Sequence, residues 1–95
     1  MSVKIIIRRK VPKSKEAKLL PLFLELRSKA ITQPGYISGE TLRNVNEPED
    51  YVVIGTWKSV ADWKTWESSK ARKEIQSKID ALMDEKPVYG IYFYG

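Results

Sequence analysis

The chain contains no cysteine and no histidine among its 95 residues. Without cysteine there is no disulfide framework, no thiolate metal site and no cysteine nucleophile. Without histidine the chain lacks the commonest general base near neutral pH and the commonest metal ligand. The acidic residues show no paired spacing that suggests a carboxylate metal site. We therefore expect no metal ion and no bound cofactor.

Long apolar runs are missing as well. None approaches the roughly 20 residues that a membrane span requires. The N-terminus, MSVKIIIRRK, places positive charge after a short apolar run, which is the reverse of a secretory signal. We expect one cytoplasmic domain over residues 1–95, with no membrane association. The net charge of +5 is spread along the chain, as on a solvated surface. Attraction to an anionic ligand or to nucleic acid is the alternative interpretation.

Tryptophan, in contrast, is concentrated in one short segment. The three tryptophans, Trp57, Trp63 and Trp66, fall within ten residues. Tryptophan buries a large apolar surface, and its N–H usually finds a partner when buried. The cluster therefore marks either a core seam or the wall of a pocket.

Hydrophobic spacing, turn residues and prolines divide the chain into alternating strands and helices. Pro21 should kink the first helix or mark the restart of a helix. Gly39 is a candidate β-bulge. Ser59 and Asp62 resemble a capping box at the start of the second helix. A strand is predicted over 3–9, a helix over 14–31, strands over 36–44 and 51–58, helical segments over 60–67 and 70–84, and a last strand over 88–94.

The order β-α-β-β-α-β predicts a ferredoxin-like α+β fold, with helices on one face of a four-stranded antiparallel sheet. In the first strand Val3, Ile5 and Ile7 point one way and Ile6 points the other. The other strands also carry apolar residues at both parities, whereas a half-solvated sheet should alternate more cleanly. Because the helices cover only one face, we expect a second copy to cover the other and form a homodimer.

The chain resembles the antibiotic biosynthesis monooxygenase family of dimeric α/β-barrel proteins. The resemblance covers nearly the whole sequence. It rests on PGY at 34–36, on WKS at 57–59, on the helix VADWKTW at 60–66 and on SSK at 68–70. It implies that two ferredoxin-like protomers build an α/β barrel, with a pocket in each protomer between sheet and helices.

The family includes haem-degrading enzymes, and the resemblance implies which residues that reaction would need. Trp66 matches the tryptophan of that branch, but Ile7 stands where its asparagine would be. Gln76 stands near the position of its iron-ligating histidine, and a neutral amide is a poor haem ligand. Haem degradation by that mechanism is therefore not expected.

The cofactor-independent oxygenases of the family act on electron-rich phenols and quinols. The resemblance implies that such a substrate would lie against Trp66, Ile7, Phe23 and Tyr92. Arg9 shares a strand face with Ile7 by parity, so it is either a surface residue at the strand end or a cation that stabilises a phenolate. No catalytic base is identified.

Two functional hypotheses remain. One is a cofactor-independent monooxygenase that acts on a small aromatic or quinone-like compound; the other is a non-catalytic dimer that binds a small molecule or is purely structural. An RNA-binding sheet is not expected, because YVVIGTWK lacks the aromatic pattern that stacks bases. The Gly-rich anion loop of acylphosphatases and the Cys-x-x-Cys of metal chaperones are also missing.

Overall fold

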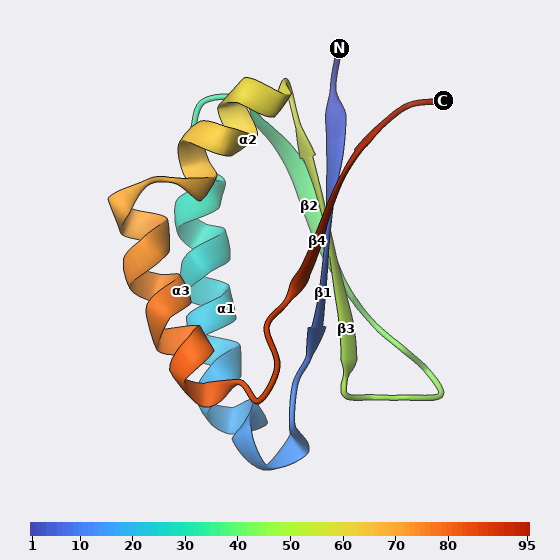
Figure 1. Ribbon diagram of the computed structural model, residues 1–95, viewed down its shortest axis with the longest axis vertical. Coiled ribbons are helices and arrows are strands. Elements are labelled where there is room, and N and C mark those ends of the chain that lie inside the picture. The colour runs from blue at the N-terminus through green and yellow to red at the C-terminus, as the bar shows by residue number, and fades with distance from the viewer.

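The protein is described from a computed structural model that covers residues 1–95, and it forms two layers (Figure 1). The helices lie together on one face of the sheet, and the opposite face is open. None of the helices is long and apolar enough to cross a membrane. The elements in chain order are β1 (Val3–Lys10), the 3-10 turn η1 (Lys13–Lys15), α1 (Glu16–Ala30), β2 (Tyr36–Arg43), β3 (Asp50–Trp57), α2 (Val60–Glu67), α3 (Lys70–Leu82) and β4 (Val88–Phe93).

The sheet has four antiparallel strands in the order β2-β3-β1-β4, which confirms the predicted ferredoxin-like fold. β1 therefore lies at the centre, between β3 and β4. In the register of β1 with β3, Ile5 lies opposite Gly55 and Ile7 opposite Val53. The odd-numbered residues of β1 face the helices, and Val3, Ile5 and Ile7 belong to the buried core.

The helix boundaries follow from their capping residues. Ser59 accepts a hydrogen bond from the Asp62 N–H at 3.1 Å, and Ser69 accepts one from the Arg72 N–H at 3.2 Å. These caps satisfy backbone donors that the first turns of α2 and α3 would otherwise leave free. α1 runs through Pro21 in one piece, so the predicted restart does not occur, although the proline still lacks the N–H for one helical bond.

The turn into β2 requires glycine at position 35. Gly35 has a φ of +85°, and a Cβ placed on it would lie 2.3 Å from the Asp62 carboxylate oxygen. Its carbonyl accepts a hydrogen bond from the Lys58 N–H at 2.7 Å. The predicted bulge at Gly39 is wrong: Gly39 pairs in register with Gly55, and the irregularity lies between Tyr36 and Ser38.

The two faces of the sheet differ in burial. The core is formed between sheet and helices, and Val3, Ile5, Leu19 and Ile79 are almost completely buried in it. On the open face the apolar side chains remain half-buried or exposed: Ile6, Leu42, Val52, Ile54, Val88 and Tyr92.

Candidate functional site

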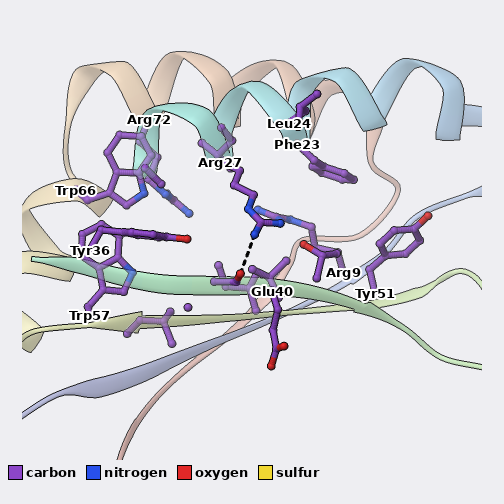
Figure 2. A pocket seen from close by; sticks show the side chains of 18 of the residues that line it. Arg9, Phe23, Leu24, Arg27, Tyr36, Glu40, Tyr51, Trp57, Trp66 and Arg72 are labelled. Carbon is purple, nitrogen blue, oxygen red and sulfur yellow. Dashed lines mark hydrogen bonds between the residues drawn. The ribbon is translucent and has the colours of Figure 1, made fainter. Parts of the chain in front are cut away.

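A cavity of about 280 Å³ lies between the sheet and α1 (Figure 2). It is near the lower end of the ligand-pocket range of about 300–1,000 Å³. It is also well above the roughly 150 Å³ of an engineered apolar cavity that holds benzene. Its space is therefore large enough for a small ring system, and its lining is mainly apolar and aromatic.

The floor of the cavity, which is its sheet side, has space above it because two glycines face each other across neighbouring strands. Gly39 of β2 lies opposite Gly55 of β3, and both line the cavity. A Cβ on Gly39 would lie 2.6 Å from the Tyr36 hydroxyl, and one on Gly55 would lie 3.3 Å from Nε1 of Trp57. The missing side chains thus leave room for these two rings to lie over the sheet, where they form one wall.

The aromatic wall extends from β2 across β3 to α2. The rings of Tyr36 and Trp57 meet edge to face, with centroids 5.4 Å apart. Trp57 packs against Trp63 in a similar way at 5.8 Å. Trp66 lies beside them and lines the cavity (Figure 2). The tryptophan cluster is therefore both core seam and pocket wall, since each indole is buried and also borders the cavity.

Arg9 is a buried cation in this apolar space. It is 5% exposed, and its guanidinium carbon lies 5.0 Å from the centroid of the Phe23 ring. Its Nη2 donates to Oε1 of Gln76 at 3.3 Å, whereas its Nε is buried without a hydrogen-bond partner. Burial is the main cause that lowers the pKa of Arg9 from its ordinary value; the charge of nearby Arg72 acts in the same direction, and Tyr89 opposes it.

Arg72 brings a second buried guanidinium to the cavity from α3. It is also 5% exposed, and it lies over the Trp63 ring at 5.4 Å. Its Nη2 donates to the Tyr89 hydroxyl at 2.6 Å. Neither Arg9 nor Arg72 forms a salt bridge. Two positive charges therefore face a mainly apolar space, and no carboxylate lies within salt-bridge distance of either; Asp80 acts on Arg9 only from further away.

No carboxylate is directed into the cavity. Glu40 is the one acidic residue that borders it, and Figure 2 shows its carboxylate pointing away from the cavity. No group of three or more acidic side chains is placed to hold a metal ion. Apart from Glu40, the polar side chains that line the cavity are those of Arg9, Arg27, Tyr36, Thr41, Tyr51 and Arg72, together with the indole N–H groups.

The structure brings together four of the five residues predicted to contact a ligand. Trp66, Ile7, Arg9 and Phe23 all line the cavity, and Arg9 is buried rather than a surface residue. Tyr92 is the exception. It pairs with Lys4, whose side chain points to the open face of the sheet, and it is 53% exposed. Alternate residues of β4 point to opposite faces of the sheet, so the sequence already placed Tyr92 on the same face as Val88 and opposite to Tyr89. Assigning Tyr92 to the pocket was therefore wrong.

Arg72, Tyr36 and the two floor glycines were not predicted from the sequence. The helical period that places Ile75 and Ile79 inward also places Arg72 and Gln76 inward, since all four share one face at steps of three and four. That signal was present and could have found Arg72. The pairing of Gly39 with Gly55 carries no local signal, because it depends on the register between two strands.

Comparisons with known proteins agree with this architecture. The profile of the antibiotic biosynthesis monooxygenase family matches residues 2–78. No curated protein matches the sequence significantly. Among solved structures, a conserved protein from Methanosarcina mazei Go1 superposes with a TM-score of 0.90 at 18% identity, covering 97% of this chain and 91% of that one.

Two further structures show the same fold. SnoaB, a cofactor-independent oxygenase from Streptomyces nogalater, has a TM-score of 0.88 at 18% identity, over 99% of this chain and 93% of its own. Rv0793 from Mycobacterium tuberculosis has a TM-score of 0.87 at 12% identity, over 99% and 95%. At such identities these likenesses show the fold alone, whereas the profile covers most of the chain. This chain belongs to the antibiotic biosynthesis monooxygenase family.

Proposed function

We propose that the protein is a cofactor-independent monooxygenase that acts on a small, electron-rich aromatic or quinone-like compound. The observation that carries the proposal is the combination of an aromatic-walled cavity of about 280 Å³ with the buried, unbalanced guanidinium of Arg9. Family membership supports the same reading. Trp66, Phe23 and Arg9 line the same cavity, so a bound aromatic ring would lie close to the arginine.

The chemistry needs no external reductant. A deprotonated phenol gives electrons to dioxygen, one oxygen atom is inserted at the ring carbon, and the other leaves as water while the ring becomes a quinone. For a phenol with a free para position, four electrons leave the ring and dioxygen takes up four. The protein must bind the substrate, exclude water and stabilise the negative charge that develops on the substrate oxygen.

Arg9 fulfils the last requirement. A positive charge close to a bound phenol favours the phenolate and lowers the pKa of the substrate hydroxyl. Because no carboxylate faces the cavity, the reaction relies on this lowered substrate pKa rather than on a protein base. The indoles of Trp57 and Trp66 both border the cavity, and they hold the substrate ring in place.

The test is oxygen consumption with 1,8-dihydroxynaphthalene, an electron-rich bicyclic phenol. The wild-type protein should form 5-hydroxy-1,4-naphthoquinone with one labelled atom from ¹⁸O₂ and release the second atom in water. Trp66→Phe should lower the rate through weaker stacking. Tyr92→Phe is the matched control on the open face and should leave the rate unchanged. Oxygen uptake equal to that of a protein-free solution would refute the oxygenase proposal.

The alternative is a protein that binds such a compound without transforming it, and the lack of a carboxylate base in the cavity favours it. Saturable quenching of tryptophan fluorescence by 1,8-dihydroxynaphthalene, without oxygen uptake, would support this alternative. Trp66→Phe should then weaken binding while leaving the protein folded, because phenylalanine keeps much of the apolar volume.

We also propose that the protein is a homodimer that packs sheet against sheet. The open face carries half-buried Ile6, Val52 and Ile54 around the centre of the sheet, and a stable interface needs at least about 1,200 Å². Ile54→Lys should place a charge in this interface and yield a folded monomer. Sedimentation of the wild-type protein as a monomer at micromolar concentration would refute the dimer.

A further inference from the structure

Arg9 and Arg72 are unusual because each is buried without a negative partner. Buried charges in proteins are normally paired, because desolvating an ion is costly and a nearby opposite charge offsets that cost. The buried Nε of Arg9 has no hydrogen-bond partner at all. The acceptors bonded to these two guanidinium groups are neutral: the Gln76 side-chain oxygen and the Tyr89 hydroxyl.

The neighbouring contacts fix the positions of both cations. Gln76 accepts from Arg9 and donates its own amide to Asp80 at 2.9 Å, so the Asp80 carboxylate is held one residue away from Arg9. Trp63 and Tyr89 lie against the Arg72 guanidinium at 5.4 and 5.5 Å. Figure 2 shows the Arg9 and Arg72 side chains directed into the cavity from different elements. The donors are thus preorganised, and both arginines border the same cavity as the tryptophans.

We infer that the Arg9–Arg72 end of the cavity is an oxyanion subsite, and that the ligand is a planar apolar molecule carrying a carboxylate or phenolate group. The aromatic wall receives the ring system, and the anionic group supplies the acceptor that the Arg9 Nε lacks. Charge-assisted hydrogen bonds to a guanidinium are stronger than neutral ones, so a neutral isostere should bind less well. The inference rests on the ligand cavity proposed above, but not on oxygen chemistry.

The experiment compares two redox-inert probes of nearly equal shape, 1-naphthoate and 1-naphthamide, by calorimetry at constant ionic strength. The wild-type protein should bind naphthoate about tenfold or more tightly than naphthamide. Arg9→Met should abolish that preference while keeping the naphthamide affinity. Arg8→Met is the matched control, because it removes the same charge from the adjacent residue on the open face, and it should keep the preference.

A second pair of measurements separates the two sources of the oxyanion. 1-Naphthol is titrated with and without protein, and its absorbance reports the phenolate. If the subsite takes phenolates, the bound naphthol should ionise at a lower pH than free naphthol, and Arg9→Met should remove the shift. Arg9→Lys keeps the charge but loses the planar donor set, so it should retain part of the phenolate shift and lose most of the naphthoate preference.

The outcomes are distinct. Equal affinity for naphthoate and naphthamide in a folded wild-type protein, or equal losses in Arg9→Met and Arg8→Met, would overturn the subsite. A dimer structure in which a carboxylate of the second copy accepts a hydrogen bond from the Arg9 Nε would also overturn the subsite. Anion-selective, Arg9-dependent binding in a protein that consumes no oxygen would uphold the subsite and refute the oxygenase.

Discussion

Arg8 and Arg9 are neighbours on β1, yet they lie in opposite electrostatic settings. Arg8 points to the open face, its Nη2 lies 3.1 Å from Oδ2 of Asp50, and its side chain is 61% exposed. Arg9 points to the helices, is buried and has no ionic partner. The charge on the open face is therefore offset by an ion pair, whereas the buried charge on the inner face opposes folding and needs another explanation.

The same division holds for the apolar residues of the strand. Ile5 is 1% exposed and fills the core, while Ile6 is half-buried on a face that no helix covers. Side chains that are alike in chemistry therefore contribute differently to the stability of a single protomer. Substitutions on each face can test whether the inner face stabilises the protomer and whether the open face contributes through association and ion pairs.

The largest effect is expected from truncating the inner face. Ile5→Ala should lower the free energy of unfolding by about 2–5 kcal/mol, because a buried isoleucine leaves a cavity that closely packed neighbours fill only in part. Ile6→Ala should cost less at low protein concentration. If the open face is the dimer interface, the Ile6→Ala penalty should grow with protein concentration, since association stabilises the folded state by mass action.

Urea unfolding at several protein concentrations measures both penalties. The comparison fails if Ile6→Ala costs as much as Ile5→Ala at every concentration. In that event the open face would be part of the protomer's own core, contrary to the exposure of its side chains.

The two arginines should respond to the same substitution with opposite signs. Arg9→Met should raise the free energy of unfolding by about 1 kcal/mol, because removing an uncompensated buried charge outweighs the lost bond to Gln76. Arg8→Met should lower it by about 0–1 kcal/mol, as is usual for an exposed ion pair. Thermal unfolding of both variants beside the wild type gives the two signs directly.

A loss of stability in Arg9→Met would show that this arginine is a structural element of the core. A gain combined with loss of naphthoate binding is the signature of a residue kept for function at the expense of stability. That pattern would also explain why the chain tolerates a buried Nε without a partner.

The fold could be predicted from the sequence because its signals are local. The apolar spacing of 19–30, the caps at Ser59 and Ser69 and the β-branched strand of 3–9 each determine one element, and their order leaves few arrangements of the sheet. The helix through Pro21 was less predictable, because tertiary packing overrides the local cost of a proline.

The candidate site was predictable only in part. Parity placed Arg9 on the side of Ile7, but its burial depends on α3 and β4, which are distant in sequence. The floor of the cavity depends on the register that sets Gly39 opposite Gly55. Such features arise from non-local pairing, so no periodicity within one segment reveals them.

The smallest expected effect is the loss of stability at acid pH that follows protonation of Asp50, the partner of Arg8 on the open face. The pKa of Asp50 is lowered from its ordinary value, mainly by the hydrogen bond from Asn44 and further by Arg8. Both donors lie 3.1 Å from its Oδ2. A carboxylate whose pKa is lower in the folded state stabilises that state above the unfolded pKa of about 3.9. This contribution is lost as the pH falls through the folded value.

The wild-type protein should therefore exceed Asp50→Asn in stability by a constant amount above about pH 5, and the gap should close below about pH 4. Asn44→Ala removes the principal cause of the shift, so it should move the closing of the gap to higher pH. The urea concentrations at the unfolding midpoints of the two proteins, measured from neutral to acid pH, report this difference in stability. A gap that stays constant down to the acid limit would contradict this account, because the contribution of Asp50 would then not depend on its charge.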